Sequence, residues 1–369
     1  MLQSFGFQGR AKVVSGKSIV QIDDYLAQLG EGERSLFERI FKVFVTEGAI
    51  EPPDTMIPWI EARFGPVERV RRQKIVKIVN LITMESALFN NLRAGRPMEA
   101  RSSEDVEEAI KAQEGDPFCR PLELTPADVF GRIKGNHSIT ASNVAKYDCF
   151  HGLVIFDQHN PLVFGLEEVK DYFDTALAWA RQAHQIDPEA RYFFLMWNCL
   201  WKSGASIIHG HLQMTLTKGM HYAKIEALRR AALNYRERFG SNYFDDLYRV
   251  HKALELGWEE NGVRYLVYLT PIKEKETLLM AWDLSDPLKE AAYRVLRAFI
   301  DKLGVKSFNL ALYMPPLATT PEDWGGFPFL IRVVDRGDPS NRTADFGAME
   351  LYAASVISDD PFRVAEALR

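Results

Sequence analysis

The order of apolar patterns between residues 151 and 216 constrains the fold more than any other feature of the sequence. HGLVIFD (151–157) has the length and continuous apolar character of a buried strand, and residues 166–186 have helical periodicity. RYFFLMWN (191–198) and SIIHGHLQMTL (206–216) then predict two further strands. A strand, a helix and two strands in this order predict an α+β unit whose helix covers one face of an antiparallel sheet.

Similar elements recur in the C-terminal part of the chain. Two predicted strands, a helix and two more strands follow one another at residues 263–272, 277–284, 288–303, 308–314 and 327–335. We therefore expect two related α+β halves in a duplicated fold, extending over residues 90–222 and 223–369.

The N-terminal part, residues 1–89, has a different pattern and predicts a helical region. Residues 23–45 and 68–89 carry apolar residues at steps of three and four, which is typical of amphipathic helices. Three prolines within residues 51–58 separate the two predicted helical stretches.

Composition excludes several classes of protein. The 369 residues, 47% of them hydrophobic, are enough for one large domain or two moderate ones, and the net charge of −5 offers no footprint for long nucleic acid. No apolar run approaches the roughly 18 residues of a membrane span, and the N-terminus lacks the apolar core of a signal peptide. Three cysteines are too few for a disulfide framework, so we expect a cytoplasmic protein without membrane partners.

The segment GASIIHGHLQ, from Gly204 to Gln213, places two histidines one residue apart. Alternate side chains of an extended strand share a face, so His209, His211 and Gln213 are expected to point into one site. A histidine that donates one ring N–H to a fixed acceptor can attack phosphorus with its other nitrogen. Ser206 and Gln213 can donate hydrogen bonds to phosphoryl oxygens, which predicts phosphorus chemistry at this segment.

The order Gly-Ala-Ser-x-x-His-x-His-x-Gln resembles the active-site segment of the galactose-1-phosphate uridylyltransferase family, within the histidine-triad superfamily. Three more stretches resemble that family in the same order: Arg93-Ala94-Gly95-Arg96-Pro97, Asp116-Pro117-Phe118-Cys119 and the C-terminal segment from Ala348. The resemblance runs from about residue 90 to the C-terminus and implies histidine-triad-like antiparallel sheets in both halves.

The resemblance also implies a mechanism and roles for individual residues. His211 attacks the α-phosphorus of a nucleotide to give a nucleotidyl-histidine, while His209, Ser206 and Gln213 support the reaction. A phosphate or a sugar phosphate then takes the nucleotidyl group. The candidates for binding the nucleotide or the acceptor are Arg93, Arg96, Asn198, Lys202, Gly204 and Glu350, with Arg342 as a further acceptor-site candidate.

In the same family a structural zinc ion, where present, is bound by Cys-x-x-Cys, a strand histidine and the first histidine of the pair. The matching residues are Asp116, Cys119, His151 and His209, a set that can still bind zinc tetrahedrally. The alternative is a lost site, in which His209 orients its neighbours through hydrogen bonds. No other cofactor is expected, and the remaining histidines are expected to be structural or exposed: His137, His159, His184, His221 and His251.

Two alternatives to a hexose-1-phosphate uridylyltransferase remain open. The first is an ATP adenylyltransferase, or a phosphorylase of diadenosine tetraphosphate or of a nucleotide sugar. Trp197-Asn198-Cys199 and His-x-His-Leu-Gln also resemble diadenosine tetraphosphate phosphorylases, which use the same nucleophile. A non-catalytic nucleotide-binding protein is the second alternative. The expected partners are a nucleotide or nucleotide sugar and a phosphate or sugar phosphate, and the resemblance implies a homodimer. Phe327–Leu330 stands where the family has histidines in its second half, so no second metal site is expected.

Overall fold

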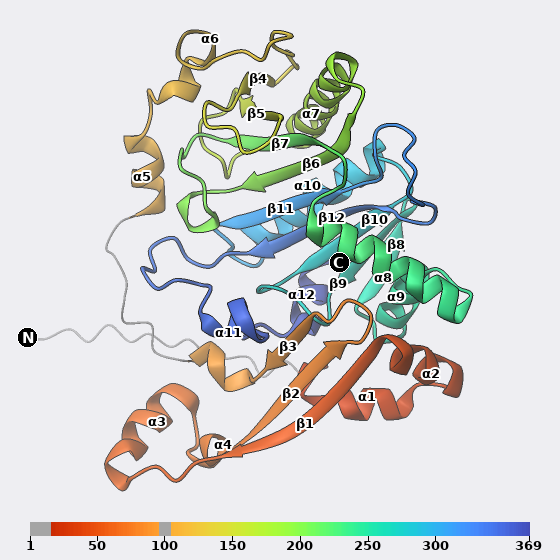
Figure 1. The fold of residues 1–369 in the computed structure, drawn as a ribbon. Helices are drawn as coiled ribbons and strands as arrows, with labels where there is room; N and C mark the ends of the chain where they lie inside the picture. The colour runs from red at the N-terminus through yellow and green to blue at the C-terminus, as the bar shows by residue number, and fades with distance from the viewer. Residues whose placement is uncertain (1–15, 96–104) are drawn as a thin grey trace, which may run out of the picture.

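The computed structural model describes residues 16–95 and 105–369, and a nine-stranded antiparallel sheet is its centre (Figure 1). The strand order is β4-β5-β7-β6-β11-β12-β10-β9-β8, and every neighbouring pair is antiparallel. The strands are β4 (Ser138–Ser142), β5 (Phe150–Phe156), β6 (Ala190–Asn198), β7 (His211–Lys218), β8 (Gly257–Glu260), β9 (Val263–Val267), β10 (Thr277–Ala281), β11 (Phe308–Tyr313) and β12 (Phe329–Asp335). The α+β class expected from the sequence is confirmed.

Two helices, α7 (Leu166–Ile186) and α10 (Asp286–Asp301), cover one face of this sheet. Their apolar sides pack on alternate strand residues, so that Trp179 of α7 and Trp197 of β6 are fully buried in one core. Each large apolar side chain buried in this way stabilises the fold by roughly 1.5–3 kcal/mol relative to its exposed state. The opposite face carries the paired-histidine segment.

The strand order reads the same from both ends once the outermost strand β8 is set aside. Each half contains two strands, a helix and two strands in chain order, and the halves meet where Met196 of β6 lies opposite Ala311 of β11. A row of paired residues runs across the four central strands at this point: Gln213 of β7 lies opposite Met196, and Arg332 of β12 lies opposite Ala311. The two units therefore share one topology, whereas their origin by duplication stays a prediction.

The expected helical region at residues 1–89 is wrong for three segments. Strands β1 (Phe41–Ala49), β2 (Arg72–Asn80) and β3 (Ser86–Phe89) form a second sheet of order β1-β2-β3-β13, whose last strand, β13 (Ser355–Ile357), comes from the C-terminal part. Apolar residues in β1 and β2 fit both a helical and an alternating pattern, and their β-branched residues favour the strand. In the part of this region that the structure describes, the α-helices are α1 (Ile22–Gln28), α2 (Glu31–Ile40), α3 (Ile57–Phe64) and α4 (Glu68–Arg71).

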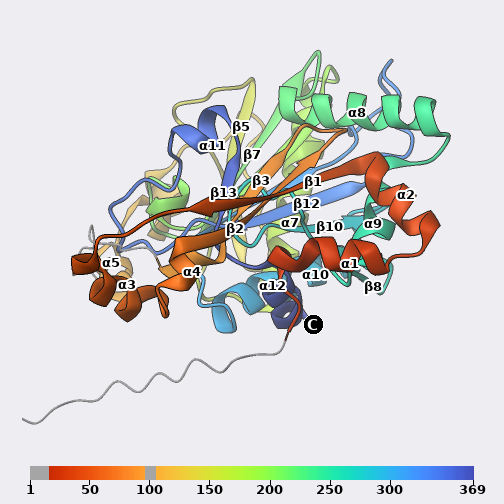
Figure 2. The same ribbon diagram turned by 90° about the horizontal axis from the view of Figure 1, so that it is seen from below.

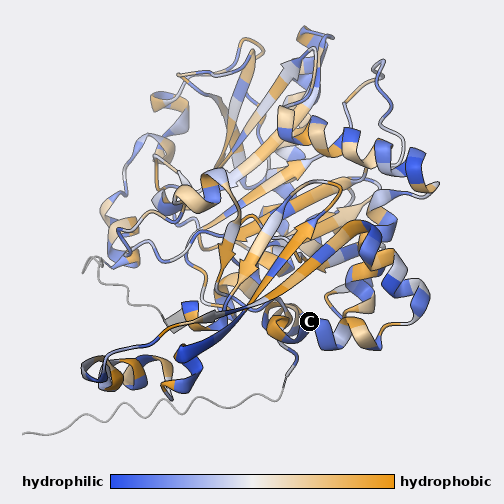
Figure 3. Cartoon of the chain, turned by 60° about the horizontal axis from the view of Figure 1, so that its bottom comes forward, coloured by the Kyte–Doolittle hydropathy of each residue, from blue (hydrophilic) through white to orange (hydrophobic). Residues whose placement is uncertain are grey.

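This second sheet packs on the C-terminal unit rather than standing alone (Figure 2). Phe41, Ile78 and Phe89 share a core with Tyr243 and Tyr268, and apolar colour follows the strands of both sheets in Figure 3.

The boundary expected at residue 222 falls in the turn between β7 and the next helix. The remaining helices are α5 (Val106–Ala112), α6 (Pro121–Leu124), α8 (Ala223–Phe239), α9 (Tyr243–Ala253), α11 (Ala348–Tyr352) and α12 (Pro361–Leu368). None of the helices in the described ranges combines the length and the apolar character that crossing a membrane requires.

Arg332 joins the two sheets, and its removal is expected to destabilise the protein. Its Nε donates to Glu276 Oε1 at 2.6 Å and its Nη1 to Glu85 Oε1 at 2.9 Å, while Glu276 is only 1% exposed. In an Arg332→Leu variant both carboxylates lose this partner, so the free energy of unfolding should fall by about 3–5 kcal/mol in denaturant titrations. Arg34→Leu, which removes an exposed pair with Glu38, should leave the unfolding midpoint nearly unchanged. Equal effects of the two substitutions would contradict this role.

Candidate active site

His211 opens strand β7 and is held in one tautomer by the backbone. Its ring is buried, and its Nδ1 lies 2.8 Å from the carbonyl oxygen of His209. Because a carbonyl oxygen only accepts, Nδ1 carries the proton and Nε2 keeps its lone pair. Burial lowers the pKa of His211, which favours the neutral ring. Phe118 holds this ring edge-on, with 5.1 Å between ring centroids. The site thus presents a neutral imidazole with a free Nε2.

His209 does not lie on the strand with His211, contrary to expectation. β7 begins at His211, and His209 sits in the turn before it, where its Nε2 lies 2.8 Å from the carbonyl oxygen of Phe156. Its Nδ1 turns toward a separate cluster of ligand-type side chains. His211 and Gln213 are two residues apart on β7, so their side chains lie on the same face of the sheet as expected, whereas His209 lies outside the strand.

That cluster consists of Asp116, Cys119, His159 and His209, whose ligand atoms all lie within 4.8 Å of one another. The Nδ1 atoms of the two histidines are 3.1 Å apart, and Cys119 Sγ lies 3.4 Å and 3.5 Å from them. Asp116 begins the short 3-10 helix Pro117–Cys119, where its Oδ1 accepts the N–H groups of Phe118 and Cys119. This local cap aims Asp116 and Cys119 at the same point.

Both histidines of the cluster turn the same kind of nitrogen inward. His159 Nε2 lies 2.9 Å from the carbonyl oxygen of Ile110, and His209 Nε2 is bonded to that of Phe156 in the same way. Both Nε2 atoms therefore carry protons, and two Nδ1 lone pairs face each other without a hydrogen between them. Burial lowers the pKa of His209, which opposes a charged ring here.

The donor set and its spacing fit a tetrahedral metal ion. Two nitrogens bound to one zinc ion at 2.0–2.1 Å lie about 3.4 Å apart, close to the 3.1 Å between the inward Nδ1 atoms. Asp116 Oδ2 is buried and has no hydrogen-bond partner in residues 16–95 and 105–369, so one carboxylate oxygen is left for a cation.

His151, expected as a metal ligand, is not part of this cluster. It lies on β5, fully buried, with its Nε2 3.2 Å from Gln213 Oε1 and its ring against Tyr147. His159 takes its place, although no spacing along the chain selects this residue. The missed signal is the register: Ile155 lies opposite His211, so a residue just after β5 must lie beside residues just before β7.

The connection between β6 and β7 carries three further candidates. Asn198 ends β6 two residues after Met196, which lies opposite Gln213, and therefore shares the row of His211. Its Oδ1 accepts a hydrogen bond from Asn309 Nδ2 at 2.6 Å, across the junction of the two units. Gly204 has a φ of 98°, a left-handed conformation that suits glycine, and Ser206 is exposed in the same loop.

A cavity of about 340 Å³ brings Arg93, Lys202 and Glu350 together. Arg93 Nε is buried and has no hydrogen-bond partner among the residues that the structure describes. Lys202 Nζ instead donates to the carbonyl oxygens of Asn341, at 2.8 Å, and Thr343, so it fixes the loop after β12. Glu350 Oε2 accepts the N–H of Gly347 at the start of α11. Of the other candidates, Arg342 is exposed in this loop, and Arg96 lies outside the described residues.

Several solved structures resemble this fold. An ADP-glucose phosphorylase from Arabidopsis thaliana, with bound ADP-glucose, matches with a TM-score of 0.58 and 16% identity over 78% of this chain and 96% of its own. A GalT-like protein from Arabidopsis thaliana matches with a TM-score of 0.53 and 16% identity over 70% and 92%. A uridylyltransferase matches with a TM-score of 0.54 and 16% identity over 79% and 96%.

At the level of sequence, no protein-family model and no curated protein matches the chain. The resemblance expected from the histidine motif is thus confirmed in the fold: the chain has the fold of the uridylyltransferases and of ADP-glucose phosphorylase.

Proposed function

We propose that this protein is a nucleotidyltransferase or phosphorylase that forms a covalent nucleotidyl-histidine on His211. One observation carries the proposal: the buried His211 ring is tied through Nδ1 to the His209 carbonyl oxygen, which leaves Nε2 as the nucleophile. A neutral imidazole with one fixed tautomer is what direct attack on phosphorus requires.

In the first step Nε2 of His211 forms a bond to the α-phosphorus, and the bond from that phosphorus to the leaving oxygen breaks. The leaving group departs with the electron pair of the broken bond, and the imidazole becomes a cation. Its Nδ1–H stays hydrogen-bonded to the carbonyl oxygen of His209. In the second step an oxygen of phosphate or of a sugar phosphate attacks the same phosphorus. The nitrogen–phosphorus bond then breaks, and the neutral ring is restored.

Polar groups near His211 support this chemistry. Gln213 shares the face of His211, and its Oε1 lies toward His151 Nε2, which leaves the Gln213 amide N–H groups for phosphoryl oxygens. Asn198 lies in the row of His211, and Ser206 is exposed in the loop before it. The cavity lined by Arg93 and Glu350 is proposed for the acceptor, because the unpartnered Arg93 Nε suits a phosphate oxygen.

A nucleotide sugar is the proposed donor. The solved structures with this fold include an ADP-glucose phosphorylase and a uridylyltransferase, which supports a nucleotide sugar without fixing the base. Diadenosine tetraphosphate is the second candidate, on the resemblance around Asn198 alone.

We also propose that Asp116, Cys119, His159 and His209 hold a zinc ion. The support is the pair of inward Nδ1 lone pairs and the unpartnered Asp116 Oδ2. A bound ion in such a site is structural: it fixes the His209 side chain, whose own carbonyl group holds His211.

The nucleophile is tested with donors labelled in the α-phosphate: ADP-glucose, UDP-glucose and diadenosine tetraphosphate. Acid-labile label should appear on His211 with at least one donor, and phosphate or a hexose 1-phosphate should discharge it. His211→Asn should lose the label and at least about a thousandfold of turnover. His184→Asn on α7, on the other face of the sheet, is the matched control. No label from any donor would leave a nucleotide-binding protein without this chemistry.

The metal proposal is tested by native mass spectrometry and elemental analysis of the purified chain. One zinc ion per chain should be present, and Cys119→Ser and His159→Ala should each lose it. His151→Ala should keep the metal, because its ring lies outside the cluster. Zinc lost from the His151 variant but kept in the His159 variant would contradict the assignment.

A further inference from the structure

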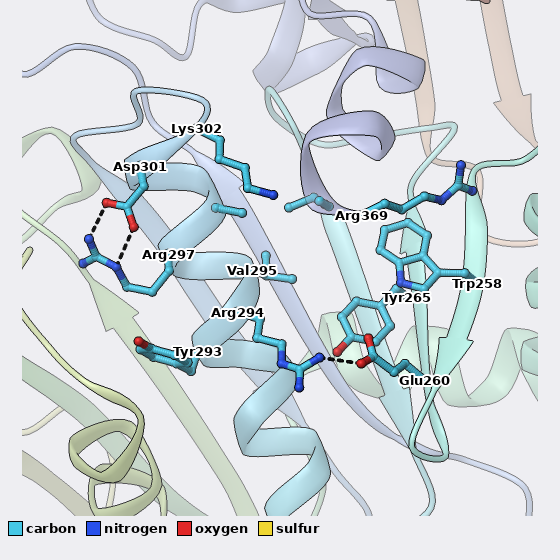
Figure 4. A pocket seen from close by; sticks show the side chains of 12 residues that line it. Trp258, Glu260, Tyr265, Tyr293, Arg294, Val295, Arg297, Asp301, Lys302 and Arg369 are labelled. Carbon is cyan, nitrogen blue, oxygen red and sulfur yellow. Dashed lines mark hydrogen bonds and ion pairs between the residues drawn. The ribbon is translucent and has the colours of Figure 1, made fainter.

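A second large cavity lies on the α10 face of the nine-stranded sheet, away from His211 (Figure 4). Its volume is about 430 Å³, and it is lined by α10 with the following Lys302, by β8 and β9, and by the end of α12 with Arg369. Tyr265 belongs to the core under α10, whereas His211 shares its face with Ile155 in a separate small cluster. The cavity is within the usual size range for small-molecule sites, roughly 300–1,000 Å³.

Two aromatic rings form one wall of the cavity. Trp258 lies directly opposite Tyr265 in the β8–β9 pair, and their rings stack with centroids 5.1 Å apart and planes 11° apart. Burial raises the pKa of Tyr265 to about 12, so its hydroxyl stays protonated and can donate a hydrogen bond.

The outer side of the indole already accommodates a planar group. The guanidinium of Arg369 lies 5.1 Å from the Trp258 ring centroid, and its Nη2 donates to the carbonyl oxygen of Glu255 at 2.7 Å. Arg369 is exposed, so a ligand ring can take this place on Trp258 and leave the guanidinium to bind an anion.

The charges around the cavity do not balance. Arg294 pairs with Glu260 at 2.5 Å, and Arg297 pairs with Asp301, as the dashed lines in Figure 4 show. Within the described ranges, Lys302 and Arg369 lie within ion-pair distance of no carboxylate. Lys302 Nζ donates only to the carbonyl oxygen of Ala367, at 2.9 Å. Two cations without carboxylate partners beside an aromatic wall favour an anionic ligand with a planar ring.

We propose that this cavity binds a nucleoside monophosphate or a closely similar planar anion. Its ring takes the place of the Arg369 guanidinium on Trp258, which is itself stacked on Tyr265, and its phosphate meets Lys302 and Arg369. The site is separate from the His211 chemistry and does not depend on it. It gives the chain a second nucleotide-binding position on the opposite face of the sheet.

The test is calorimetric titration of the full chain with AMP and with UMP, with ribose 5-phosphate and inorganic phosphate as ring-free probes. His211→Asn serves as the background, so that covalent chemistry does not contribute. Lys302→Glu and Trp258→Leu should each weaken nucleoside monophosphate binding at this site at least tenfold. In the chain with native His211, Lys302→Glu should leave the labelling of His211 unchanged. Lys306→Glu, the same charge change on an exposed residue outside the cavity, is the matched control.

Binding that Lys302→Glu leaves unchanged would overturn the proposal. Equal affinity for ribose 5-phosphate or inorganic phosphate would overturn it too, because the aromatic wall would then contribute nothing. Lys302 is exposed, so this variant keeps the test valid if Trp258→Leu fails to fold. Since binding is measured directly, absence of label on His211 would refute the proposed function and leave this site standing.

Discussion

The hydrogen bond between His211 Nδ1 and the carbonyl oxygen of His209 decides which ring nitrogen of His211 keeps its lone pair. It forms because Gly210 folds the turn tightly against the end of β5, where its N–H donates to His159 and its carbonyl accepts from Phe156. A Cβ at Gly210 would lie 2.5 Å from a Phe156 ring carbon and 3.2 Å from a backbone oxygen of Gln158. Only glycine permits this approach, so the reactive tautomer rests on the packing of one turn.

The same turn couples the proposed metal site to the proposed nucleophile. His209 uses its ring in the cluster and its carbonyl oxygen on His211, so any force that fixes the ring also fixes the acceptor. His159 contributes in two ways as well, because its backbone oxygen accepts the Gly210 N–H while its Nδ1 faces the cluster. A metal bound there therefore stiffens the backbone around the nucleophile and needs no contact with substrate.

The sequence predicted the elements whose pattern is unambiguous. The helix between residues 150 and 218 was predictable because its apolar residues follow the helical period, and the strands beside it because their apolar runs are short. β1 and β2 were not, because their apolar spacing fits both periods and only the partner strand decides between them. Asp116, Cys119 and His209 were found through the resemblance. His159 needed the β5–β7 register, which is information from pairing in space rather than from spacing along the chain.

The nine-stranded sheet contains two equivalent positions for a site of this kind, and the chain places a histidine at only one of them. Leu330 lies two residues before Arg332 on β12, as His211 lies two residues before Gln213 on β7, so an apolar side chain stands in the position that corresponds to the proposed nucleophile. Leu330 is buried in the core that includes Phe41, and Arg332 is engaged by Glu85 from the N-terminal part. The N-terminal sheet thus covers this face of the second unit, whereas the corresponding face of the first unit carries His211. The strands within residues 41–89 therefore cover the position in the second unit that corresponds to His211 in the first.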